Sequence, residues 1–338
     1  MKVKTEGSIQ DLPAVWMEGS DVVMIEQRKL PGVFELLRAT TTEEVAISIR
    51  DMAVRGAPSI GATAAYGMAQ AQMLGEDLDA AAEKLKATRP TAFDLFYAVD
   101  LMQKLARTGG DLAEASRSYA DNLTARCRRI GEHGEKLIRD GARILTHCNA
   151  GALATLDHGT ALAPIREAHA RGKGIFVFAD ETRPRMQGAR LTVWELMQED
   201  IPHALIADNA AGHFMQRGEI DMVITGADRV TLAGDAANKI GTYEKAVLAR
   251  ENGIPFYVAV PVSTIDFSME DWRDIPIEER GEDEVLSVWG KRLSPEGARA
   301  RNPAFDVTPA KYITGIITEE GVFKPEEIGG LKDRLGTL

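Results

Sequence analysis

The feature that most constrains the fold is a change of sequence pattern at about residue 140. Beyond this point, short apolar runs alternate with stretches of helical periodicity. Strands separated by helix-length segments form parallel sheets, because a parallel connection needs a crossover, and the crossover helices then cover both faces. We therefore predict a Rossmann-like parallel-sheet domain with strands at 144–147, 175–179, 204–207, 221–225, 256–260 and 312–317.

The first 139 residues have a different texture. Apolar runs at 14–17, 22–25 and 34–37 predict a small antiparallel sheet. Thr41 followed by Glu44 has the spacing of a capping box and predicts a helix that runs to about Val54. Alanine-rich helical patterns continue at 60–74, 78–87, 92–107 and 111–139. The fold class is therefore α/β, with a sheet and helical bundle in residues 1–139 and the Rossmann-like domain in residues 140–338.

Composition excludes several classes of function. The formal net charge of -11, without any dense cluster of Lys and Arg, argues against a nucleic-acid-binding surface. The N-terminus lacks the apolar core of a signal peptide, and no apolar stretch has the length of a membrane helix. The two cysteines, Cys127 and Cys148, do not suggest a disulfide framework. We expect a cytoplasmic protein without nucleic-acid or membrane partners.

The sequence also argues against a cofactor. No Gly-x-Gly-x-x-Gly follows a predicted strand and no Gly-Lys-Ser/Thr loop occurs, so a dinucleotide or a nucleoside triphosphate is not expected. The six histidines show no zinc-binding spacing. We expect a mechanism that uses neither metal nor cofactor.

Two of the predicted strands run into a reactive side chain. Cys148 follows the run at 144–147, and Asp228 follows the run at 221–225. Ligands of open parallel sheets bind in the crevice beyond the carboxyl ends of the strands, so this thiol and this carboxyl can converge on one site. If Asp228 points into a closed pocket, desolvation would raise its pKa and let it act as a general acid.

Both residues also have simpler interpretations. A lone cytoplasmic cysteine is usually a small buried hydrophobe, although the neighbouring Asn149 and Gly151 do not suit a packed strand interior. Asp228 could instead cap a following helix or pair with Arg229.

Four loop segments supply groups that could hold an anion and hydroxyls. At residues 55–61, one helix ends and the next begins, so free backbone N–H groups and the helix dipole favour an anion. The segments 89–91, 183–188 and 238–239 add arginines, a glutamine, an asparagine and a lysine. Each segment alone is more often solvated surface. Their combination suggests a clamp for phosphate and hydroxyl groups.

Taken in order, these blocks resemble the methylthioribose-1-phosphate isomerase family. The resemblance extends to residues 275–280 and 302–309 and so covers nearly the whole chain. It implies that Cys148 and Asp228 are the catalytic pair, a homodimer, a small-molecule sugar phosphate substrate, and a C-terminal domain shared with regulatory subunits of a translation-initiation exchange factor. The residues that it implies for substrate binding are Arg55, Gly56, Ala57, Arg89, Gln187, Asn238 and Lys239.

The implied reaction converts 5-methylthioribose 1-phosphate to the corresponding ketose, a step of methionine salvage. Asp228 would donate a proton to the ring oxygen, and Cys148 would assist the transfer of hydrogen from C2 to C1, as hydride or through an enol phosphate.

The chain departs from the family pattern beside the catalytic blocks, at Glu26, Phe93–Asp94, Ala150 and residues 233–235. These departures leave open the group on C5 of the sugar, so 5-deoxyribose 1-phosphate and ribose 1,5-bisphosphate are alternative substrates. A non-catalytic regulatory subunit is the alternative function. A nucleotide-dependent oxidoreductase is disfavoured because the glycine fingerprint is missing.

Overall fold

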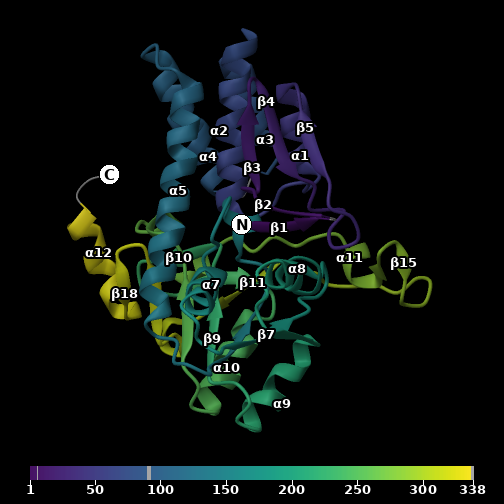
Figure 1. Cartoon of the computed structure of the whole chain (residues 1–338), viewed down its shortest axis with the longest axis vertical. Coiled ribbons are helices and arrows are strands. Elements are labelled where there is room, and N and C mark those ends of the chain that lie inside the picture. Colours follow the sequence, from purple (N-terminus) through teal and green to yellow (C-terminus); the bar gives the residue numbers. More distant parts are fainter. Residues whose placement is uncertain (6, 90–92, 336–338) are drawn as a thin grey trace. The chain divides into compact units, whose positions relative to one another are not determined.

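The computed structural model describes residues 1–5, 7–89 and 93–335 and forms two compact units (Figure 1). The first unit comprises Met1–Gly131 and Ala150–Ala163, and the second comprises Glu132–Asn149 and Pro164–Leu338. The chain first passes from one unit to the other within helix α5 (Leu112–Glu135), close to the boundary expected after residue 139. The return of Ala150–Ala163 to the first unit was not expected.

The first unit contains the expected antiparallel sheet. Strands β3 (Val15–Glu18), β4 (Asp21–Ile25) and β5 (Leu36–Ala39) pair in that order, with the buried strand β4 in the centre. A second hairpin, β1 (Lys2–Thr5) and β2 (Ser8–Asp11), was not predicted, because β2 is exposed along its whole length and has Ile9 as its single apolar residue.

The helices of the first unit lie close to their predicted positions. Helix α1 (Thr42–Arg50) begins with the predicted capping box of Thr41 and Glu44 but ends before Val54. Helix α2 (Ala57–Leu74) is buried over most of its length and packs against α1, α3 (Leu78–Ala87) and α4 (Phe93–Arg107). A helix that is apolar on all sides belongs in the centre of a bundle, and α2 occupies that place.

The second unit is built on a seven-stranded sheet. The first six strands in chain order are mutually parallel where they pair, and the last strand is antiparallel to its neighbour. Across the sheet the order is β8-β7-β6-β9-β12-β17-β18, so the parallel strands read 3-2-1-4-5-6, the order of doubly wound sheets. The predicted parallel sheet is confirmed. Its strands are β6 (Arg143–Thr146), β7 (Phe176–Asp180), β8 (His203–Ile206), β9 (Met222–Thr225), β12 (Phe256–Ala259), β17 (Gly315–Thr318) and β18 (Gly321–Phe323).

A second sheet in this unit was not predicted. It has four strands in the order β13-β10-β11-β16, and it is mainly antiparallel. The strands are short and lack apolar runs, with Ala-Ala-Asn-Lys in β11 as the clearest case. The bounds are β10 (Arg229–Thr231), β11 (Ala236–Lys239), β13 (Ile265–Asp266) and β16 (Phe305–Thr308).

Further α-helices, one π-helix and one hairpin connect these elements, together with several 3-10 turns. The helices and the hairpin strands are α6 (Ala152–Thr155), α7 (Leu162–Ala170), a π-helix at Gly188–Thr192, α8 (Val193–Gln198), α9 (Ala211–Gln216), α10 (Thr242–Glu251), α11 (Asp283–Leu286), α12 (Ile328–Leu335), β14 (Ser287–Val288) and β15 (Lys291–Arg292). Among the described helices, none combines the length and the apolar character that a bilayer span requires.

Candidate active site

The two candidate catalytic residues follow strands that are direct neighbours. Strands β6 and β9 pair in parallel, with Ile144 opposite Met222 and Leu145 opposite Val223. They are strands 1 and 4 of the sheet, so the strand order reverses between them. Ligands of doubly wound sheets bind at this switch point, beyond the carboxyl ends of the strands. Cys148 and Asp228 each lie a few residues past these ends.

Cys148 is held in a strained backbone conformation. Its φ is 65°, a left-handed value that costs a non-glycine residue about 1–3 kcal/mol and persists only where the surroundings enforce it. Here the Cys148 N–H donates to Thr182 Oγ1 at 2.9 Å, and the Cys148 carbonyl accepts from Thr192 Oγ1 at 2.6 Å. Cys148 is partly exposed, whereas Cys127 is fully buried. The interpretation as a small buried hydrophobe therefore suits Cys127 and not Cys148.

Asp228 lies in a connection between strands. Strand β10 begins at Arg229, so the interpretation of Asp228 as the N-cap of a helix is wrong. The Asp228 N–H donates to the Ala237 carbonyl at 2.8 Å, and Arg229 forms an ion pair with Asp266 at 3.3 Å. Asp228 is exposed. The desolvation that a general acid needs is therefore not supplied within the second unit, and a bound substrate would have to provide it.

Lys239 connects the two candidate groups electrostatically. It ends strand β11 and is only 7% exposed. Burial lowers the pKa of its ammonium, while the negative charges of Cys148 and Asp228 act in the opposite direction. Its Nζ donates to the Ala304 carbonyl at 2.9 Å and lies 4.2 Å from the centre of the Phe305 ring. The second unit thus brings a thiol, a carboxyl and a buried amine into one electrostatic neighbourhood.

Gln187 and Asn238 are the other predicted binding residues in this unit. Both are buried, Gln187 at 7% exposure. Within the described part of the chain, Gln187 Oε1 is a buried acceptor without a hydrogen-bond partner. Such an orphan oxygen is costly unless a donor reaches it, and a ligand hydroxyl would do so. Asn238 is already engaged, since its Nδ2 donates to Thr242 Oγ1 at 2.9 Å.

The remaining predicted binding residues belong to the first unit. Arg55 Nε donates to Gln27 Oε1 at 3.2 Å, and Gln27 Nε2 donates to the Leu153 carbonyl at 2.9 Å. Gly56, with φ of 90°, precedes α2, and a Cβ at this position would lie 2.6 Å from Ala154. The sequence therefore requires glycine where the helix N-terminus presents its N–H groups.

Helix α2 begins at Ala57, the third residue of this predicted anion site. Arg89 is half-buried, and residues 90–92 of its predicted motif lie outside the described residues. That Arg55, Gly56, Ala57 and Arg89 act on the same substrate as Cys148 stays a prediction.

Sequence reasoning missed several residues of this site. Thr182 and Thr192, which hold the Cys148 backbone, come from segments 34 and 44 residues away in sequence. His147 was missed as well, although a histidine at the end of a buried strand was a signal that could have been followed.

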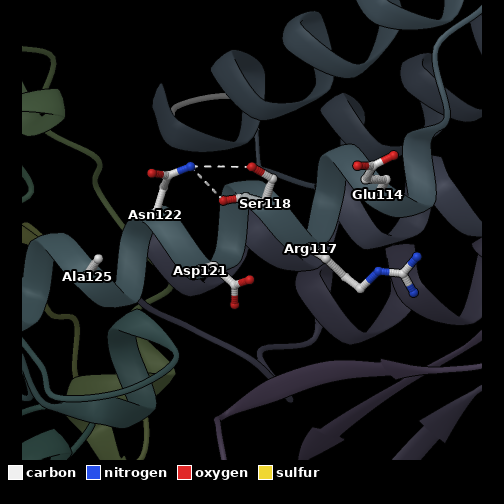
Figure 2. A pocket seen from close by; sticks show the side chains of 6 residues that line it. All are labelled: Glu114, Arg117, Ser118, Asp121, Asn122 and Ala125. Carbon is white, nitrogen blue, oxygen red and sulfur yellow. Dashed lines mark hydrogen bonds between the residues drawn. The ribbon is translucent and has the colours of Figure 1, made fainter.

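Two surface hollows are lined by residues outside the predicted site. Figure 2 shows one of about 520 Å³ on helix α5, lined by Glu114, Arg117, Ser118, Asp121, Asn122 and Ala125. Its Asn122 donates to the carbonyl and the hydroxyl of Ser118. The other, of about 550 Å³, lies between the segment around Arg185 and the β14–β15 hairpin.

Comparison with known proteins identifies the family. The model of the Initiation factor 2 subunit family matches residues 53–325. The methylthioribose-1-phosphate isomerase of Roseiflexus castenholzii is 53% identical over 334 residues, which covers 92% of this chain and 94% of the relative. The enzyme of that name from Aquifex aeolicus is 49% identical and covers 97% of this chain and 72% of the relative.

Solved structures agree. The crystal structure of 5-methylthioribose 1-phosphate isomerase from Pyrococcus horikoshii OT3 gives a TM-score of 0.91 at 42% identity and covers 97% of both chains. The crystal structure of the translation initiation factor eIF-2B, subunit delta, from A. fulgidus gives a TM-score of 0.85 at 40% identity. It covers 94% of this chain and 97% of that one. The chain therefore belongs to the methylthioribose-1-phosphate isomerase family, and its predicted assignment to the isomerases is confirmed.

Proposed function

We propose that this enzyme converts 5-methylthioribose 1-phosphate to 5-methylthioribulose 1-phosphate, a step of methionine salvage. One observation carries the proposal beyond the family assignment. Cys148 and Asp228 follow neighbouring parallel strands at the switch point of the sheet, and the ammonium of buried Lys239 interacts electrostatically with both. A site of this kind can manage proton transfer and charge without a cofactor.

The chemistry must begin at the ring oxygen. The anomeric carbon carries phosphate, so the ring cannot open to the free aldehyde on which ordinary aldose isomerases depend. In the proposed mechanism, Asp228 donates its proton to the ring oxygen as the bond from that oxygen to C1 breaks. The ring oxygen becomes a hydroxyl group, and positive charge develops at C1. A substrate that covers the exposed Asp228 would raise its pKa and favour the acid form.

Hydrogen then moves from C2 to C1 by one of two routes. In the first route, C2 passes a hydride to C1, and the C2 hydroxyl loses its proton to give the ketone. In the second, C2 loses a proton to give an enol phosphate, and C1 is then protonated as the ketone forms. In the hydride route, the Cys148 thiolate accepts the proton of the C2 hydroxyl. In the enol phosphate route, it accepts the proton from C2, returns it to C1 and then accepts the proton of the C2 hydroxyl. In both routes the thiol finally passes one proton, directly or through water, to the Asp228 carboxylate, which restores the acid. The ammonium of Lys239 stabilises the thiolate.

The proposed binding groups form two sets, one for the phosphate and one for the sugar hydroxyls. We propose that Arg55 and Arg89, with the backbone N–H groups at Gly56 and Ala57, hold phosphate. Gln187, whose buried Oε1 lacks a protein donor among the described residues, accepts a hydrogen bond from a sugar hydroxyl.

We further propose that the protein is a cytoplasmic homodimer. The net charge of -11 agrees with a protein that does not bind nucleic acid. Sedimentation of the purified protein tests the dimer.

The test is an assay of the purified protein on 5-methylthioribose 1-phosphate, 5-deoxyribose 1-phosphate and ribose 1,5-bisphosphate. Product formation is followed by proton and phosphorus magnetic resonance. We expect the first substrate to have the highest kcat/KM, and a higher value for either of the others would reassign the substrate. Running the reaction in deuterium oxide separates the routes, because only the enol phosphate route places deuterium on C1.

A regulatory subunit is the second candidate function. It is favoured by the 40% identity to the structure described as a translation initiation factor subunit. Absence of turnover on all three sugar phosphates, with a folded protein that still binds one of them, would favour this alternative.

A further inference from the structure

A buried histidine bridges the two segments that carry Cys148 and Lys239. The His147 side chain is 0% exposed. Its Nδ1 lies 2.8 Å from Asp180 Oδ2, and its Nε2 lies 2.8 Å from the Ile240 carbonyl oxygen. His147 directly precedes Cys148 in sequence, and Ile240 directly follows Lys239. One ring therefore connects the carboxyl end of β6 to the end of β11.

The proton count of this bridge follows from its geometry. A carbonyl oxygen only accepts hydrogen bonds, so Nε2 carries a hydrogen. The contact between Nδ1 and Asp180 needs a second hydrogen, which belongs either to an imidazolium or to a protonated carboxyl. If that shared proton leaves, a lone pair on Nδ1 faces a carboxylate. The alternative tautomer relieves this repulsion only by giving up the bond to Ile240. The hydrogen bonds of His147 to Asp180 and to the Ile240 carbonyl can therefore coexist only while the shared proton is present.

The groups around the pair are charged and largely buried. Lys245 is 0% exposed, and its Nζ lies 3.6 Å from Asp180 Oδ2, donates to the Asp208 carbonyl at 2.7 Å and pairs with Glu244. The Asp208 carboxylate lies 3.9 Å from Nδ1 and accepts the N–H groups of residues 182 and 183.

Asp306 faces the bridge from β16. It accepts from the N–H groups of Gly241 and Tyr243 at 2.7 and 3.1 Å. Burial raises the pKa of Asp306, and it also raises the pKa of Asp180. The titratable groups that face His147 are therefore Asp180, Asp208, Asp306 and Lys245, with Glu244 at the edge.

The same cluster has the ligand types of a metal site. His147, Asp180 and Asp208 offer ligand atoms within 4.8 Å of one another, as a divalent cation would require. However, both imidazole nitrogens are engaged, and the ammonium of Lys245 already supplies the positive charge. A metal would have to displace these bonds.

The backbone on both sides of the His147 ring has a left-handed conformation that brings the two segments close to the ring. Gly241 has φ of 100°, and a Cβ at this position would lie 3.0 Å from His147 Cε1. Any other residue would push the segment after β11 away from the ring. Cys148, on the other side of the bridge, has the strained φ of 65° that needs enforcement.

We propose that His147 and Asp180 form a one-proton lock that sets the position of Cys148 relative to Lys239. They act as positioning residues, because neither is argued to touch the substrate. Their importance for turnover rests on the proposed function, but the geometry of the lock does not.

The test combines two measurements on purified variants. The first is the rate at which iodoacetamide alkylates Cys148, located by mass spectrometry, with buried Cys127 as the internal reference. The second is kcat and KM with 5-methylthioribose 1-phosphate. The variants are His147→Gln, Asp180→Ala and Asp180→Asn. His203→Gln is the matched control, because His203 lies at the start of β8 and its Nδ1 contacts the nearby Ile201 carbonyl oxygen at 2.7 Å.

We expect His147→Gln and Asp180→Ala to change the Cys148 alkylation rate at least threefold. We expect them to lower kcat about tenfold to a hundredfold, as loss of a charge-assisted bond would, with KM within about threefold. Asp180→Asn should recover most of both quantities, because its amide donates to Nδ1.

The control and the outcomes separate the lock from the reaction. His203→Gln should leave alkylation and turnover unchanged, and circular dichroism verifies that each variant is folded. Altered alkylation that Asp180→Asn restores supports the lock even if no sugar phosphate is turned over, in which case only the proposed function fails. Unchanged Cys148 alkylation in folded His147→Gln and Asp180→Ala overturns the lock, whatever their activity.

Discussion

The carboxylate of Asp221 joins the amino ends of the two strands whose carboxyl ends lead to the candidate catalytic pair. Its Oδ2 accepts from the Arg143 N–H at 2.8 Å and from Arg143 Nε at 3.0 Å. Its Oδ1 accepts from guanidinium nitrogens of Arg139 and Arg143 at 2.7 and 3.0 Å. Arg143 begins β6, and Asp221 directly precedes β9. Replacing Asp221 by asparagine removes the charge and leaves the shape.

The magnitude follows from the pKa of this group. Burial raises the pKa of Asp221, but the bonds from Arg143 and Arg139 outweigh it and lower the value from 3.8 to about 2. At about 1.4 kcal/mol per pKa unit this corresponds to at most about 2.5 kcal/mol, and solvent screening of the exposed arginines reduces it to about 1–2 kcal/mol. Because the folded pKa lies below the unfolded one, this stability is present above about pH 4 and is lost as the pH falls toward 2.

Urea unfolding of the wild type and Asp221→Asn at pH 7, 5, 4 and 3 measures this contribution. We expect a deficit of about 1–2 kcal/mol that is constant between pH 7 and 5 and shrinks between pH 4 and 3. Asp100→Asn is the matched control, because Asp100 is 63% exposed and pairs only with Lys86 among the ion pairs of the described residues, so its removal should cost less than about 0.5 kcal/mol. An Asp221→Asn deficit that is the same at every pH would refute the reasoning.

Three further predictions concern the reaction. Cys148→Ser and Asp228→Asn should fold and bind sugar phosphate but lose at least about a hundredfold in kcat, and near-normal turnover in either variant would remove its assigned role. Exhaustive chelation and omission of nicotinamide should leave the activity intact, whereas loss that one divalent ion restores would show a metal requirement. Arg89→Ala should weaken substrate binding about tenfold to a hundredfold and Arg89→Lys less, as measured by the ligand-induced rise in Tm, and an unchanged rise would make Arg89 a surface residue.

The parallel sheet was predictable because its central strands are buried on both faces and therefore read as continuous apolar runs, whereas the partly exposed edge strand β18 was not predicted. The place of Cys148 and Asp228 beyond β6 and β9 followed from that pattern alone. The four-stranded sheet was not predictable, because its strands are short. In addition, β11 does not show the alternation of polar and apolar residues that is typical of a half-buried strand. Asn238 and Lys239 were therefore expected in a loop, whereas both lie in strand β11.

The missed bridge shows the limit of local patterns. In the sequence, His147 ends an apolar run, and no neighbouring residue predicts its hydrogen-bond partners. Asp180 and Ile240 lie 33 and 93 residues further along the chain. Only the pairing of β6 with β7 and the placement of β11 bring them to the ring. The same argument applies to Asp228, whose interpretation as a helix cap failed because a strand and not a helix follows it.

The chemistry of the site is divided between two sheets of the second unit. The seven-stranded sheet supplies the thiol and the carboxyl from strands that become neighbours only because the order reverses at β6 and β9. The four-stranded sheet supplies the buried amine of Lys239. A strained backbone at Cys148 and a desolvated amine are each unfavourable alone, and the fold retains them where the surrounding bonds enforce both. His147 bonds to both sides of this division, so a change that loosens the four-stranded sheet should alter Cys148 reactivity without touching β6 or β9.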